Sequence, residues 1–113
     1  MAYSELSALR IRDGLTASGT AHLTEKRMMG GLIFLINGNM LLGLKTLKSG
    51  AEQFMFRVGP EHEAEALAMG GARPMIHGAR RMTGFMFVDD CDDAVFARLS
   101  GMARSYVETL PAK

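Results

Sequence analysis

Residues 28–44 form a run of 17 residues without a charged side chain, divided near its middle by Asn37-Gly38. The run is shorter than the ~20 residues that a helix needs to cross a bilayer. Two apolar segments joined by Asn-Gly are typical of a β-hairpin, because a type I′ turn requires positive φ at both central positions. We therefore predict strands over 32–36 and 39–44, apolar on both faces and central in a covered sheet.

Two further segments show the period of two that indicates strands. Phe54, Phe56 and Val58 alternate with more polar residues, and they predict a third strand on which they share one face. The segment 75–88 predicts a second hairpin that turns near Gly78 and places the phenylalanines at 85 and 87 on one face.

Three helices are predicted. The first covers 4–18, and the second is a short helix that begins at Gly59-Pro60 and ends at the glycine pair 70–71. The third follows the aspartate-rich segment 89–93, after which apolar residues recur at helical spacing as far as Leu110. This last helix is expected to pack its apolar stripe on the sheet.

The resulting order is helix, hairpin, strand, helix, hairpin, helix, within 113 residues. That length suits one domain with one core. The sequence therefore predicts a single α+β domain over 1–113, with a mainly antiparallel sheet of hairpins packed by N-terminal, middle and C-terminal helices.

Charge and cysteine content narrow the possible partners and compartments. The chain has 13 Lys+Arg against 12 Asp+Glu, a formal net charge of +1, which argues against direct, specific nucleic-acid binding. Its one cysteine excludes an internal disulfide, and the start Met1 to Glu5 lacks the basic and apolar regions of a signal peptide. We expect a cytoplasmic protein that is not attached to a membrane.

Segments that resemble catalytic or ligand motifs are incomplete. Residues 38–46 nearly match the phosphate-binding loop G-x-x-x-x-G-K-[ST], but Leu44 adds one residue before the lysine, and the segment lies in a hairpin strand. His62 begins an H-E-x-x-H pattern in which Ala66 replaces the second zinc ligand. Cys91 lies among four aspartates, whose charge disfavours the thiolate. We predict no catalytic, cofactor-binding or metal-binding residue.

The chain contains ten methionines, more than its length leads one to expect. A flexible thioether fills irregular gaps in a core, and it also suits an adaptable binding surface. Core packing is the default interpretation, and the binding surface remains the alternative.

A short repeat supplies candidate binding residues. The tetrapeptide beginning at Arg27 (RMMG) is echoed by the one beginning at Arg81 (RMTG), and each leads into an apolar strand. If those strands are neighbours, the arginines converge at one rim and would bind an anion or an acidic partner. Otherwise the glycines let the strands bend, and the arginines cover the sheet edge. The candidate residues are Arg27, Arg57, Arg80, Arg81, Gly30, Gly31 and Gly84.

Several short blocks follow one another along the chain: Arg27-Met28-Met29-Gly30-Gly31-Leu32, the Gly38 hairpin, Arg57-Val58-Gly59-Pro60-Glu61, Arg73-Pro74-Met75, Arg81-Met82-Thr83-Gly84-Phe85, and the ending from Tyr106 to Lys113. In this order they resemble the TfoX N-terminal domain family, also called TfoX/Sxy, over nearly the whole chain. The resemblance implies a bacterial α+β domain from regulators of natural competence, which act as transcription coactivators alongside a cyclic-AMP receptor protein. Those regulators carry a second, C-terminal domain, whereas this chain ends at Lys113. The family implies no catalytic residues.

The leading functional hypothesis is a non-enzymatic regulatory domain whose partner is another protein, a transcription regulator by resemblance alone. The alternative is a small anionic-ligand-binding protein, or an unrecognised enzyme, that uses the arginine cluster. Weak nucleic-acid contact within a transcription complex is a third hypothesis, which the near-neutral charge limits. A homodimer, formed through an edge strand or through the methionines, is compatible with all three.

Overall fold

Asn37 and Gly38 have φ values of 51° and 82° in the computed structural model, which describes residues 3–28 and 30–113. These are the positive values that a type I′ turn requires, and the turn joins β2 (Gly31–Ile36) to β3 (Asn39–Thr46). The predicted hairpin is therefore confirmed, with one bulge between Phe34 and Leu35. Met29, part of the RMMG repeat, lies outside the described residues.

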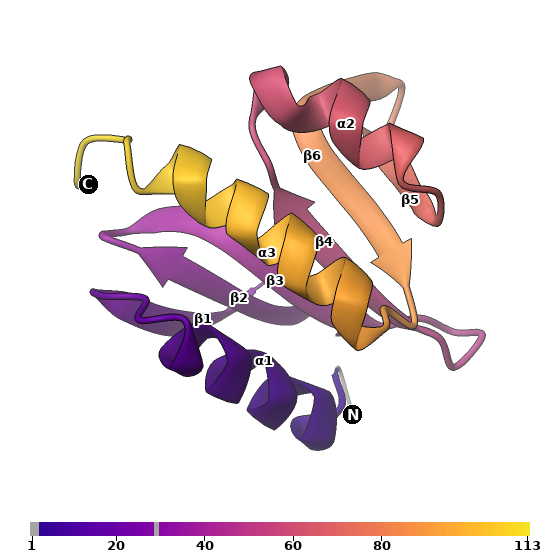
Figure 1. Cartoon of the computed structure of the whole chain (residues 1–113). Coiled ribbons are helices and arrows are strands. Elements are labelled where there is room, and N and C mark those ends of the chain that lie inside the picture. Colours follow the sequence, from indigo (N-terminus) through magenta and orange to yellow (C-terminus); the bar gives the residue numbers. More distant parts are fainter. Residues whose placement is uncertain (1–2, 29) are drawn as a thin grey trace.

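The described strands form one six-stranded antiparallel sheet with the order β1-β2-β3-β4-β6-β5 (Figure 1). Besides β2 and β3, its strands are β1 (Leu23–Met28), β4 (Glu52–Arg57), β5 (Ala72–His77) and β6 (Arg80–Asp89). The predicted hairpin that turns near Gly78 is β5–β6, and β6 also pairs with β4. The predicted α+β class, with hairpins packed by three helices, is thus confirmed.

Strand β1 was not predicted. Its residues between Leu23 and Met28 are exposed, so the segment lacks the alternation that marks a half-buried strand. It nevertheless pairs with β2 along its whole length and forms one edge of the sheet. A charged edge strand is common, because charge discourages pairing with another chain. The sequence showed the charge but not the pairing.

Helices α1 and α3 each begin after a residue whose side chain caps the helix. Ser4 precedes α1 (Glu5–Ala17), and its side chain accepts a hydrogen bond from the Ser7 amide. Asp92 precedes α3 (Asp93–Val107) and accepts from the Val95 amide at 2.8 Å. Between β4 and β5 lie a 3-10 turn, η1 (Pro60–His62), and the short α2 (Glu63–Ala68). No helix among the described residues is long and apolar enough to span a membrane.

The main core lies between the sheet and α1 and α3, which cross the same face (Figure 1). Phe34, Phe54 and Phe56 from the sheet are fully buried there, with Ile11 from α1 and Leu99 from α3. The expectation of a covered sheet therefore holds for one face only. The opposite face carries a second apolar cluster that consists entirely of strand residues, and we call it the open face.

Candidate binding trough on the open face

A concave, largely apolar cavity of about 540 Å³ lies on the open face. We call it the trough. Its volume lies within the range of small-molecule and peptide-side-chain pockets in proteins. The lining residues come from all six strands and from the β3–β4 turn: Met28, Gly31, Ile33, Gly43, Leu44, Lys45, Leu47, Gln53, Met55, Met75, Ile76 and Phe87.

The floor of the trough is a row of directly paired residues. Ile33, Gly43, Met55 and Phe87 stand opposite one another on β2, β3, β4 and β6. Paired residues project to the same side of a sheet, so this row faces away from α1 and α3. The Ile33 and Met55 side chains close over Gly43, because a Cβ there would lie 3.0 Å from the Ile33 Cδ1 and 3.3 Å from the Met55 Cε.

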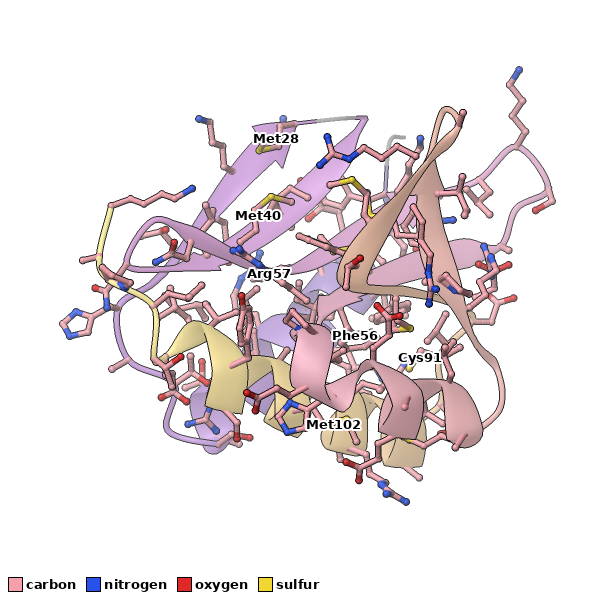
Figure 2. The ribbon with its side chains drawn as sticks, turned by 90° about the horizontal axis from the view of Figure 1, so that it is seen from above. Met28, Met40, Phe56, Arg57, Cys91 and Met102 are labelled. Carbon is pink, nitrogen blue, oxygen red and sulfur yellow. The ribbon has the colours of Figure 1, made fainter. Side chains whose placement is uncertain are left out.

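Curvature of the sheet supplies the walls. Met28 is on β1 and Ile76 is on β5, the two opposite edges of the sheet, yet both line the trough. In Figure 2, the β1–β2 and β5–β6 hairpins both rise from the sheet on the side away from α3. A register shift between Pro74 and Met75 marks an irregularity where β5 turns. Such irregularities bend strands and increase their twist.

Half of the methionines gather on the open face. Met55 and Met75 are buried in its cluster, and Met28, Met40 and Met82 pack partly buried against them. Figure 2 shows Met28 and Met40 on the side of the sheet opposite Phe56 and Met102. Both interpretations of the methionines therefore apply, since others, such as Met86, are in the main core.

Several cationic residues share the open face with the trough. Lys45 lines it, and the register places Lys26 and Arg57 on the same face, opposite Ile33 and Phe85. None of these three cations takes part in an ion pair among the described residues. A fourth, Arg73, is 3.0 Å from Asp89 and 5.5 Å from the centroid of the Phe87 ring. The open face thus combines an apolar floor with a cationic rim.

The arginines predicted from the repeat are not brought to one rim. Arg27 is on β1 and Arg81 is on β6, and three strands lie between these two. Arg27 lies on the helix-covered side, 5.9 Å from the centroid of the Tyr3 ring, and Arg81 pairs with Glu63 of α2. The condition for convergence, neighbouring strands, is not met. Gly30 follows β1 in a turn, whereas Gly84 lies within β6, and long-range pairing decides where each segment lies.

The two remaining predicted arginines also differ in surroundings. Arg57 is held between aromatic rings, 5.4 Å from the centroid of Phe85 and 5.6 Å from that of Tyr106. Arg80 is exposed at the start of β6. Of the predicted arginines, Arg57 is the one that the register places on the open face, although it does not line the trough.

Two of the three predicted glycines, Gly31 and Gly84, lie close to the backbone of another segment. A Cβ on Gly31 would lie 2.2 Å from the Leu44 carbonyl oxygen, and Gly31 lines the trough. Gly30 lies beneath the Lys45 side chain, whose Cε would be 3.6 Å from an added Cβ. Gly84 donates its amide hydrogen to Glu63 at 2.6 Å, far from the other two in the sheet order. Gly30 and Gly31 therefore lie against β3, whereas Gly84 lies against α2.

Cys91 is a buried thiol with little nucleophilic character. It is 3% exposed, and burial raises its pKa to about 11. Burial is the largest cause, Arg10 opposes it, and Asp92 and Asp93 add to it. The predicted effect of the aspartates is therefore secondary to that of desolvation.

We expect Cys91 in the folded protein to react with iodoacetamide at pH 8 at least ~100-fold more slowly than in the urea-unfolded chain, because its thiolate fraction is that much smaller. The unfolded chain releases the thiol proton first, so folding stability is expected to fall between pH 9 and about 11. Rates measured by mass spectrometry test this. Equal rates in the folded and unfolded states would contradict the burial.

Among the residues that the structure describes, no group of three or more His, Cys, Asp or Glu side chains is arranged to hold a metal ion. Comparison with protein-family models, with curated proteins and with solved structures finds no match to this chain.

Sequence reasoning missed Lys26, Lys45 and Gly43. The available signal was that the strands 32–36 and 39–44 are apolar on both faces, which requires a second buried or bound surface. Which cations surround that surface depends on strand register across the whole sheet, and periodicity within one strand does not contain this information.

Proposed function

We propose that this protein is a non-enzymatic regulatory domain that binds a partner protein in the trough. The observation that carries the proposal is the asymmetry of the sheet. α1 and α3 cover one face, while the other is apolar, concave and covered by none of the described helices. A contiguous apolar depression with a polar rim is typical of an interaction site.

The resemblance to the TfoX N-terminal domain family supports the same proposal, because that resemblance implies a transcription regulator. The near-neutral net charge of +1 favours a protein partner over bulk nucleic acid. The buried thiol of Cys91 provides no exposed nucleophile.

A site-specific crosslinking experiment tests the proposal. A photoreactive benzoylphenylalanine replaces Ile76, an exposed residue of the trough wall, and in a matched variant it replaces Ala97 on the exposed side of α3. In extract of the native host, we expect a discrete adduct from position 76 and none from position 97, because the trough holds the partner. Identical adduct patterns from the two positions would contradict docking in the trough.

A second candidate function is binding of a small amphipathic anion, since the volume of about 540 Å³ and Lys45 at the lining also suit a fatty carboxylate. This differs from the arginine-cluster hypothesis in the residue that holds the anion. Dodecanoate at ~100 times its dissociation constant would add about 2.7 kcal/mol to the free energy of unfolding and raise Tm by roughly 10 °C. A shift of that size, lost in Lys45→Glu, would favour this function over partner docking.

A further inference from the structure

We infer that the occupant of the trough is an amphipathic α-helix of the partner protein, with carboxylates flanking its apolar stripe. This inference rests on the proposed docking function and specifies its partner. Three independent features carry it: the backbone chemistry of a sheet face, the dimensions of the floor, and the cations of the open face.

The backbone of the sheet excludes an extended segment from the trough. In β2, β3, β4 and β6 the backbone N–H and C=O groups lie in the plane of the sheet and pair with neighbouring strands. An extended segment laid on this face would therefore leave its own backbone groups without partners, at considerable cost. A helix satisfies its backbone hydrogen bonds internally, so it presents side chains alone to the apolar floor.

The floor has the width of a helix. The row Ile33, Gly43, Met55 and Phe87 crosses four strands. Three inter-strand spacings of 4.7–4.9 Å give about 14 Å. A helix with its side chains is about 10–12 Å across, which fits between walls that carry Met28 and Ile76.

Several cations of the open face are not compensated within the chain. The open face holds one ion pair, between Arg73 and Asp89. Lys26, Lys45 and Arg57 on this face have no carboxylate in an ion pair among the described residues. The partner helix is the natural source of the missing carboxylates. Such complementarity acts mainly on specificity and association rate.

Three methionines in the lining, Met28, Met55 and Met75, leave charge as the main determinant of which helix binds. Flexible thioethers adapt to different apolar side chains, so the apolar stripe of the partner is loosely specified. Rim cations discriminate against a basic helix, because like charges would be brought together. We therefore expect recognition to depend on the rim residues more than on the identity of the apolar stripe.

Fluorescence anisotropy with two synthetic 18-residue helices tests the inference. Both carry the same leucine stripe, flanked by glutamates in one peptide and by lysines in the other. We expect the glutamate peptide to bind at least ~10-fold more tightly, since one rim contact of about 1.4 kcal/mol corresponds to tenfold in Kd. Lys45→Glu is expected to remove that preference. The matched variant Arg98→Glu makes the same charge change on exposed α3 and is expected to leave it intact.

The outcomes separate this inference from the proposed function. Equal binding of the two peptides, or a preference unaffected by Lys45→Glu, overturns the acidic helix. If neither peptide binds while the crosslinker at position 76 still captures a protein, the helix is wrong and docking in the trough stands. A third outcome would favour strand addition. If the glutamate peptide still binds Ile76→Glu but no longer binds a variant with an altered edge strand, the inference is overturned.

Discussion

Replacing Phe56 with alanine is expected to lower the free energy of unfolding by about 3–5 kcal/mol, the usual cost of emptying a fully buried phenylalanine site. Phe56 is 0% exposed and packs between Phe54 and Phe96. Its ring centroid lies 6.2 Å from that of Phe54 and 6.1 Å from that of Phe96. Its ring therefore joins β4 to α3 across the main core. In thermal unfolding, Tm is expected to fall by roughly 10–20 °C.

Phe85→Ala is the matched control for this prediction. Phe85 lies on the open face, where it is only partly buried and contacts the Arg57 guanidinium. Less packing is lost there, so we expect a smaller destabilisation than for Phe56→Ala in urea denaturation. Equal losses at the two positions would mean that the main core does not lie on the side of α1 and α3.

Gly84→Ala is expected to destabilise the fold by about 2–4 kcal/mol, although it adds a single methyl group. Gly84 has a φ of 85°, which L side chains rarely adopt. A Cβ there would also lie 2.9 Å from the Gly59 carbonyl carbon and 3.0 Å from the Pro60 nitrogen. These are backbone atoms, held by the hydrogen bond from the Gly59 amide to the Gly84 carbonyl, so they cannot move aside locally.

Gly101→Ala is the control for this prediction, and it is expected to change the free energy of unfolding in the opposite direction. Gly101 lies within α3 on the exposed side, and nothing lies within 4 Å of an added Cβ. Alanine lowers the backbone entropy lost on helix formation, so this variant is expected to gain about 0.5–1 kcal/mol. Urea denaturation of both variants measures the difference. A Gly84→Ala protein as stable as Gly101→Ala would rule out the close approach of β6 to η1.

Local signals account for the parts of the fold that were predictable. The Asn37-Gly38 turn, the caps Ser4 and Asp92, and the alternation around Phe54 each depend on residues within a few positions of one another. Turn geometry, helix capping and side-chain direction are short-range properties, so the hairpin and helix positions follow from the sequence.

Periodicity could not say which face of the sheet a phenylalanine would occupy. Phe54 and Phe56 were predicted to share one face, and so were Phe85 and Phe87, and each prediction is confirmed. The two pairs nevertheless lie on opposite faces, because Phe54 stands opposite Val88. That register places Phe87 in the floor of the trough.

The sequence by itself determined the α+β class, the two hairpins, the approximate positions of the helices and an excess of apolar strand surface. Only the tertiary structure decided that β1 joins the sheet, that three strands separate Arg27 from Arg81, and that Lys26 and Lys45 lie on the same face as one apolar trough. The physical reason is the range of the interactions. Turns and caps are stabilised by neighbouring residues, whereas pairing order, register and curvature are stabilised by contacts between segments far apart in the chain.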